Sequence, residues 1–287
     1  MRLTLGEHTI DCTDHTAVMG ILNVSYDSPV THSIFDPRVA LTRAIELHRA
    51  GAEIIDIGAH STRTGGRDLD TQEEIERVCP VIEAVCAEGI PVSVDTWTPA
   101  VARAAAAAGA HLLNDVTGFT DPGMVAAASE SRLPVIAMHM RGTPKHHREA
   151  DQRYEDVVEE VRTFLTRQAV ALRDSGTPQV WLDPGFGFGK SVTDNLRLLN
   201  GLPQLLDTGY PVVISASRKG FLGELLGLGD RQDVPGLLEA TVAFNVLAAS
   251  LGVHVVRVHD VAEVARALRV VAAARTARRE TYGEPER

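Results

Sequence analysis

The sequence predicts an α/β fold in which eight strand–helix units close into a parallel barrel, preceded by a short β-hairpin. Three observations favour this fold class. Short apolar runs recur along the chain, they repeatedly end in polar residues, and helical segments lie between them. Polar residues at the carboxyl ends of parallel strands are typical of barrels that carry a site there. The length of 287 residues also fits one barrel, which needs about 250.

The elements follow one another in a regular order. The predicted strands cover residues 17–22, 53–57, 91–94, 111–113, 134–138, 179–182, 211–214 and 253–256. The predicted helices cover residues 37–50, 71–87, 99–108, 122–131, 154–175, 237–250 and 261–277. Pro99 suits the first turn of its helix, and Gly51 suits the end of the first one. A hairpin within residues 1–15 is expected to cover the bottom of the barrel, and the charged tail 278–287 is expected to be disordered.

No linker or low-complexity tract interrupts this alternation, so we expect residues 1–287 to form a single domain. An open, doubly wound sheet remains the alternative, because alternation of strands and helices does not by itself distinguish it from a barrel. Eight units and a hairpin at the bottom favour closure.

The composition limits the partners and the location. A net charge of −10 without any cluster of Lys and Arg argues against nucleic acid or an anionic membrane as a partner. The three cysteines, Cys12, Cys79 and Cys86, form no Cys-x-x-Cys pair, which is typical of a reduced protein. The first residues do not resemble a signal peptide, and no apolar run approaches membrane-spanning length. We therefore expect a cytoplasmic protein.

Three polar residues at strand ends suggest a binding site. Asp95, Asn114 and Asp183 each follow or end a predicted strand, with Met138 and Phe188 nearby. Two carboxylates and an amide match a planar heterocycle with several N–H donors, because polar groups in a dry pocket must be paired. The alternative for any one of them is a cap of the next helix. All three together favour a ligand site.

The last two strands end in basic residues. Ser217-Arg218-Lys219 and Arg257-Val258-His259 occupy the positions where barrels often bind phosphate, and Arg suits phosphate oxygens. A surface cluster of ion pairs is the alternative. Asn23 ends the first strand, which adjoins the last one in a closed barrel. Its side-chain carbonyl could hold Mg²⁺ bound to a diphosphate, because Mg²⁺ prefers oxygen ligands and keeps several waters.

These residues together resemble the dihydropteroate synthase family of folate biosynthesis. The matching motifs run in order along nearly the whole chain, at residues 19–24, 61–63, 93–96, 114–118, 138–144, 183–190, 217–219 and 257–260. The resemblance implies a TIM barrel and a transferase that joins 6-hydroxymethyl-7,8-dihydropterin diphosphate to p-aminobenzoate or a related amine and releases diphosphate. It also implies Mg²⁺ as a cofactor. The apolar segment 237–250 adds the expectation of a homodimer.

The resemblance also implies roles for individual residues. The pterin would be held by Asp95, Asn114, Met138, Asp183, Phe188, Lys219 and Arg257. The diphosphate would be held by Asn23, Ser61, Thr62, Arg63, Arg257 and His259, with Mg²⁺ at Asn23. The catalytic residues would be Asp95, Lys219 and Arg257. Asp95 would stabilise the cationic methylene left by carbon–oxygen cleavage, and Arg257 with Mg²⁺ would stabilise the departing anion.

The chain departs from the family pattern where the amine acceptor is expected. The family's first loop usually has proline and phenylalanine where this chain has Tyr26 and Pro29. In the second loop, His60 replaces a glutamate, and Gly220 stands where many members carry serine. The implied acceptor residues are Tyr26, Asp27, Ser28, His60, Arg63 and Gly220. These departures predict poor use of p-aminobenzoate and weak inhibition by sulfonamides.

Two alternatives to an ordinary synthase therefore remain. One is a divergent paralogue that binds pterin without p-aminobenzoate condensation, either in a regulatory role or with a different acceptor. The other is a pterin-binding module for methyl transfer. The basic residues Lys219, Arg257 and His259 argue against a methyl carrier, because it has no diphosphate to hold.

Overall fold

The computed structural model describes residues 1–24, 36–60, 68–147, 149–229 and 234–282. Its main sheet consists of β3 (Ala17–Asn23), β4 (Ile54–Gly58), β5 (Val92–Asp95), β6 (Leu112–Asp115), β7 (Val135–Met138), β8 (Val180–Asp183), β9 (Val213–Ile214) and β10 (Val255–Val258). The spatial order of these strands is β8-β7-β6-β5-β4-β3-β10-β9, and all neighbouring pairs are parallel. A parallel bridge between Leu182 and Val212 joins the two ends of this order. The predicted barrel is confirmed, and the open doubly wound sheet is excluded.

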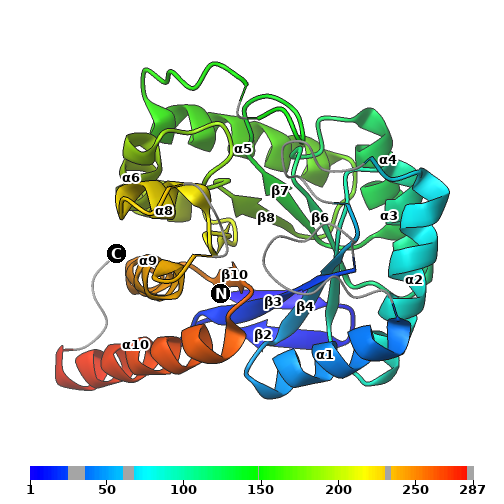
Figure 1. Cartoon of the computed structure of the whole chain (residues 1–287), viewed down its shortest axis with the longest axis horizontal. Helices are drawn as coiled ribbons and strands as arrows, with labels where there is room; N and C mark the ends of the chain where they lie inside the picture. The colour runs from blue at the N-terminus through cyan, green and yellow to red at the C-terminus, as the bar shows by residue number, and fades with distance from the viewer. Residues whose placement is uncertain (25–35, 61–67, 148, 230–233, 283–287) are drawn as a thin grey trace.

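Helices surround the barrel, as Figure 1 shows. They are α1 (Pro37–Arg49), α2 (Thr71–Ala87), α3 (Pro99–Ala107), α4 (Pro122–Ser131), α5 (Val157–Asp174), α6 (Val192–Asn200), α7 (Leu202–Leu206), α8 (Gly220–Leu225), α9 (Leu237–Leu251) and α10 (Val261–Tyr282). Local sequence fixes several of their starts. Asp36, Asp70, Asp121 and Asp156 precede their helices and accept hydrogen bonds from backbone N–H groups of the first turn.

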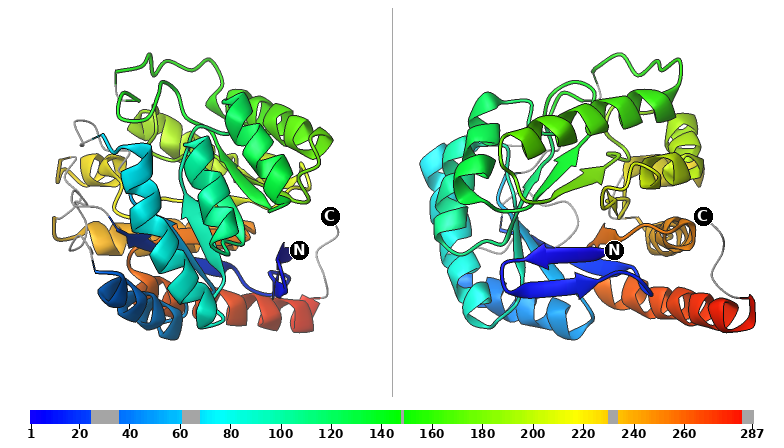
Figure 2. Two further views of the ribbon diagram at one scale, coloured as in Figure 1. Left: turned by 90° about the vertical axis from the view of Figure 1, so that its right-hand side faces the viewer. Right: turned by 180° about the vertical axis from the view of Figure 1, so that it is seen from behind.

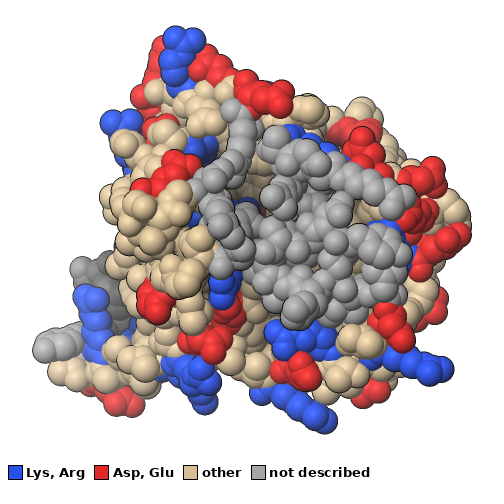
Figure 3. Space-filling view, in the orientation of Figure 1, with Lys and Arg blue, Asp and Glu red and all other residues tan. Residues whose placement is uncertain are grey.

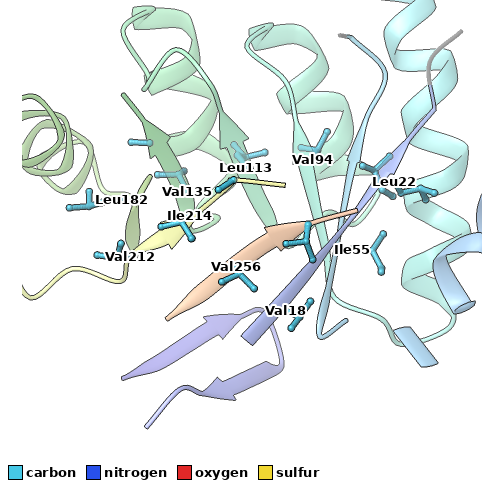
Figure 4. Packing of buried hydrophobic residues seen from close by; sticks show 14 of the residues in the cluster. Val18, Leu22, Ile55, Val94, Leu113, Val135, Leu182, Val212, Ile214 and Val256 are labelled. Atoms are coloured by element: carbon cyan, nitrogen blue, oxygen red, sulfur yellow. The ribbon is translucent and has the colours of Figure 1, made fainter. Parts of the chain in front are cut away.

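The hairpin of β1 (Arg2–Leu5) and β2 (His8–Asp11) covers the end of the barrel at which the strands begin (Figure 2). Leu3, Leu5 and Ile10 of the hairpin are buried in one cluster with Ile54 and Trp181 from the barrel interior. The outward-facing residues form a second cluster beneath the helices, to which Val18, Leu22, Ile55, Val94, Leu113, Val135, Leu182, Val212, Ile214 and Val256 belong (Figure 4). The lower interior is therefore filled with apolar side chains, so a site inside the barrel is expected at its other end.

The structure differs from the sequence prediction at three places. Helices α6, α7 and α8 were not predicted, and β9 is shorter than the expected strand 211–214. Helix α10 continues to Tyr282, so residues 278–282 are helical and the expected disorder is wrong for them. Arg279 stabilises this last turn because it pairs with Asp14 and donates to the carbonyl of Thr13 at 3.1 Å. Residues 283–287 lie outside the described part of the chain.

Candidate active site

Strand register gathers the polar residues inside the upper half of the barrel. Alternate residues of a strand face opposite sides, so Asp56 faces the interior like Ile54, and Asp183 faces it like Trp181. Asp95 is level with Asn114 on the neighbouring strand, and Met138 is level with Asp183. The residues predicted from strand ends on β5, β6, β7 and β8 are thus brought together. Asn23 lies at the end of β3, beside Gly58.

Arg257 of β10 links two of the carboxylates. Its Nε donates to Asp56 Oδ2 at 2.6 Å, and one terminal nitrogen donates to Asp95 Oδ2 at 2.7 Å. The side-chain nitrogen of Asn114 lies 3.4 Å from Asp56 Oδ1. The guanidinium is only 15% exposed, and Asp56 is fully buried. A search for polar residues at strand ends misses Asp56, because it lies in the middle of the apolar run Ile-Ile-Asp-Ile.

Asp95 retains an acceptor for a ligand. Its Oδ1 atom is buried and accepts no hydrogen bond from the described residues. Burial is the main cause that raises the pKa of the Asp95 carboxyl to about 7; Arg257 opposes the rise, and Asp56 and Asp115 add to it. A carboxyl in this state can be converted to the carboxylate by N–H donors of a ligand, because hydrogen bonds to the charged form favour it.

Asp183 ends β8, three strands from the β5 that carries Asp95, and is 2% exposed. Its Oδ1 accepts a hydrogen bond of 2.7 Å from the N–H of Gly185. Burial raises the pKa of Asp183 to about 6, while this hydrogen bond and the nearby Lys219 and Arg257 counteract the rise. Asp183 therefore combines a fixed orientation with a second oxygen that faces the same interior as Asp95.

Lys190 holds the loops after β7 and β8 together. Its ammonium group donates to three backbone carbonyls, those of Gly185 at 2.9 Å, Phe188 at 3.1 Å and His139 at 3.3 Å. Three acceptors satisfy all three N–H bonds of an ammonium group. Burial nevertheless lowers the pKa of Lys190 to about 7, and Asp183 opposes this effect. Lys190 therefore serves the structure of these loops.

Apolar side chains form one wall of the site. Val116, Met138 and Phe188 make a small buried cluster, and Trp97 and Met140 pack against it. The ammonium group of Lys219 lies 3.9 Å from the centroid of the Phe188 ring, a cation–π distance. The predicted pterin residues of both kinds, polar and apolar, thus line the same end of the barrel. A flat ring with polar edges fits between such surfaces.

His259 lies beside Arg257 at the end of β10. The Ser217 hydroxyl oxygen accepts a hydrogen bond of 3.1 Å from the backbone N–H of His259 and lies 3.0 Å from its Nδ1. This arrangement favours the hydroxyl as donor to Nδ1 and leaves the proton on Nε2. Burial, followed by the charges of Arg257 and Lys219, lowers the pKa of His259 to about 3. The imidazole is therefore a neutral N–H donor near the basic end of the site.

Not every basic residue of the motif faces the site. Arg218 makes a two-pronged ion pair with Asp260, with both distances at 2.8 Å. For this residue the ion-pair alternative is correct, and only its neighbours Lys219 and Ser217 contact site residues. Gly220 is buried at the start of α8. It carries no side chain that could contact an acceptor.

The remaining predicted residues lie at the rim or outside the described part of the chain. His60 stacks on Trp97 with a centroid distance of 4.4 Å. Tyr26, Asp27, Ser28, Ser61, Thr62 and Arg63 lie outside the described residues, so their roles stay predictions. Within the described ranges, no group of three or more His, Cys, Asp or Glu side chains could hold a metal ion. The Mg²⁺ site expected at Asn23 therefore stays a prediction.

Comparison with known proteins identifies the family. The sequence pattern of the pterin binding enzyme family matches residues 19–259. Dihydropteroate synthase of Escherichia coli (strain K12) is 41% identical over 92% of this chain and 93% of its own length. The chain belongs to the dihydropteroate synthase family.

Solved structures of the family agree with the fold. The Thermus thermophilus dihydropteroate synthase in complex with 4-aminobenzoate is 42% identical, with a TM-score of 0.84 over 95% of this chain and 99% of that one. The Xanthomonas albilineans dihydropteroate synthase in complex with 7,8-dihydropteroate is 37% identical, with a TM-score of 0.81 over 96% and 98% of the two chains. Dihydropteroate synthases are transferases, and the barrel is the framework that this chain shares with them.

Proposed function

We propose that this protein joins 6-hydroxymethyl-7,8-dihydropterin diphosphate to p-aminobenzoate and releases diphosphate, forming dihydropteroate. The observation that carries the proposal is the convergence of Asp95, Asn114 and Asp183 above the apolar floor of the barrel. The relatives whose structures contain 4-aminobenzoate and 7,8-dihydropteroate support it. The family membership at 41% identity makes the same chemistry the simplest expectation.

The polar side chains at the strand ends would recognise the edge of the pterin. Asp183 and Asp95 would accept its N–H donors, and Asn114 would supply an amide that both donates and accepts. Met138 and Phe188 would pack on the ring faces, since they belong to one buried apolar cluster. The buried and unpaired Oδ1 of Asp95 supports this assignment, because an unsatisfied buried oxygen is unfavourable until a ligand donates to it.

The chemical step breaks the carbon–oxygen bond between the pterin methylene and the diphosphate. The bonding electrons leave with the diphosphate, and the methylene becomes electron-deficient. An ionised Asp95 would stabilise that positive charge, and Lys219 would hold the ring from the Phe188 side. The amine of the acceptor then forms the new carbon–nitrogen bond and loses a proton.

The leaving diphosphate would lie near the basic strand ends. Arg257 would contribute a positive charge, and the neutral His259 would donate an N–H hydrogen bond. Both interactions with the diphosphate would strengthen as negative charge develops on it. Asn23 would hold Mg²⁺ through its side-chain oxygen. When bound, Mg²⁺ would neutralise charge on the phosphate oxygens. The assignments of Ser61, Thr62 and Arg63 to the same anion remain predictions from the family pattern.

Small molecules are the partners that this site predicts. On the face shown in Figure 3, acidic and basic side chains are interspersed rather than gathered into a basic surface. Among the residues described, no helix is both long and apolar enough to span a membrane. A cytoplasmic location and a homodimer are further parts of the proposal. The homodimer is supported by exposed leucines on α9, Leu247 at 55% and Leu251 at 40%.

The deciding experiment measures diphosphate release from the pterin diphosphate with Mg²⁺, in the presence and absence of p-aminobenzoate. Release that depends on p-aminobenzoate, with dihydropteroate as product, supports the synthase. Tight pterin binding without release would instead support a regulatory paralogue. Release that requires another amine would show an altered acceptor, as the changes at Tyr26, His60 and Gly220 predict. Failure to bind the pterin at all would refute the proposal.

A further inference from the structure

Glu74 is a buried carboxylate that lies outside the ring of strand-end residues. It belongs to the first turn of α2, and only 1% of the residue is exposed. Its Oε1 accepts a hydrogen bond of 2.8 Å from the hydroxyl of Thr96. A buried acidic side chain is tolerated only when it has partners of this kind. Thr96 is therefore the contact through which Glu74 can act on the site.

Thr96 connects Glu74 to two residues of the proposed pterin pocket. It lies between Asp95 and Trp97 in the chain, and its backbone N–H donates to the carbonyl of Asn114 at 3.0 Å. Trp97 packs against the apolar wall of the pocket. The segment that carries Asp95 and Trp97 is thus fixed on one side by the neighbouring strand and on the other by a single carboxylate.

His60 approaches the same carboxylate from the segment that follows β4. Its Nδ1 lies 3.6 Å from Glu74 Oε2, and its ring stacks on Trp97. Its Nε2 lies 3.9 Å from Asp68 Oδ1, and within the described residues neither ring nitrogen has a hydrogen-bond partner. The family pattern has a glutamate at position 60. This departure therefore places an imidazole beside a buried acidic group.

We propose that Glu74 is a positioning residue for the pterin site. Through the Thr96 hydroxyl it fixes the segment that carries Asp95 and Trp97. His60 packs beside Glu74 and Trp97. The inference rests on the proposed function, because it takes Asp95 as a pterin ligand. It adds a residue on a surrounding helix to a site otherwise built from strand ends and the loops that follow them.

The charge of Glu74 gives this role a signature that simple packing would not have. The pKa of Asp95 is raised to about 7 mainly by burial, with Arg257 opposing and with Asp56, Asp115 and Glu74 contributing as negative charges. Removal of the Glu74 charge should therefore lower the pKa of Asp95. Removal of the Thr96 hydroxyl alone should not, because it leaves the charge in place.

The test is calorimetric binding of 6-hydroxymethylpterin to the full chain across the pH range in which Asp95 titrates. Thr96→Val removes the hydroxyl that donates to Glu74 and accepts from the N–H of Thr98, and loss of the Glu74 contact alone should weaken binding about five- to tenfold, the effect of one hydrogen bond. Thr96→Ser keeps the hydroxyl and should bind within about twofold of the unmodified protein. Glu74→Gln should move the midpoint of the binding profile to lower pH, whereas Thr96→Val should leave it unchanged.

Each outcome decides the proposal. If Glu74→Gln binds the pterin with unchanged affinity and with an unchanged midpoint of the pH profile, the role of Glu74 is overturned while the proposed function stands. Absence of pterin binding by the unmodified protein would overturn the proposed function itself. If Thr96→Val fails to fold, as shown by thermal unfolding, Glu74→Gln and Thr96→Ser still decide the question, since both are close in shape to the original side chains.

Discussion

Replacing Asp183 with asparagine should separate the stability of the fold from the affinity for the pterin. The change keeps the shape of the side chain, and its remaining oxygen can still accept the 2.7 Å hydrogen bond from the N–H of Gly185. It removes the negative charge and puts donors where a carboxylate oxygen was. The fold should therefore become more stable while the ligand binds more weakly.

The magnitude follows from the pKa of the buried carboxyl. Burial raises the pKa of Asp183 from its ordinary value of 3.8 to about 6. The ionised form then costs the folded protein about 3 kcal/mol at neutral pH. Asp183→Asn should raise the free energy of unfolding by about 2–3 kcal/mol, or the melting temperature by roughly 5–10 °C. Two disrupted pterin contacts should weaken binding by about 2–4 kcal/mol, on the order of 100-fold.

The pH dependence supplies the check. A raised carboxyl pKa means that the folded state binds more protons than the unfolded state, so stability falls as pH rises from 3.8 to about 6. The gain in stability from Asp183→Asn should be complete above about pH 6 and absent below pH 3.8. Thermal unfolding across this range measures it, and Asp174→Asn at the exposed end of α5 is the matched control. A variant that is less stable at neutral pH, or that binds pterin normally, would refute the reasoning.

Three further predictions concern the surrounding residues. Arg257→Ala leaves two buried carboxylates without their cation and should destabilise the fold by about 3–5 kcal/mol at neutral pH, and less in acid, as thermal unfolding would show. Arg257→Ala should also weaken the binding of the pterin diphosphate more than the binding of a pterin without diphosphate. Equal losses of affinity for the two ligands would place the anion site elsewhere. Gly185→Ala puts a Cβ 1.9 Å from the carbonyl oxygen of His139 at a φ of +68°, so denaturant unfolding should show a loss above about 2 kcal/mol. Lys190→Met leaves three carbonyls without their donor, and we expect the same assay to show a loss of about 2–3 kcal/mol. An unchanged denaturation midpoint in either of these last two variants would contradict the corresponding loop contact.

The barrel and the inward-facing strand ends were predictable because they depend on local periodicity. Each parallel strand presents alternate residues to the interior, so Asp95, Asn114 and Asp183 could be assigned to one end from their positions alone. The same rule explains why Asn114 belongs to the site and its neighbour Asp115 does not. Asp115 faces the opposite side, where it accepts hydrogen bonds from the N–H groups of Thr117 and Phe119.

Other site residues depend on contacts between distant segments and could not be assigned from the sequence. Asp56 pairs with Arg257 although 201 residues separate them, and an acidic residue within an apolar run does not indicate its partner. Lys190 belongs to a recognisable motif, but its role depends on three backbone carbonyls that only the folded loops bring together. Glu74 likewise becomes relevant only when α2 is packed against the segment after β5 that carries Thr96.

Arg257 shows why the site requires this combination of charges. It already contacts Asp56 and Asp95, and its other terminal nitrogen lies 3.5 Å from the Ser215 hydroxyl, too far for a strong hydrogen bond. The two carboxylates hold the guanidinium in a fixed orientation, and that nitrogen can donate to an anion without breaking either contact. Because a guanidinium has five N–H donors in one plane, the same side chain can stabilise Asp95 and the departing diphosphate together. Lysine could not replace it, since a single ammonium group cannot hold this geometry.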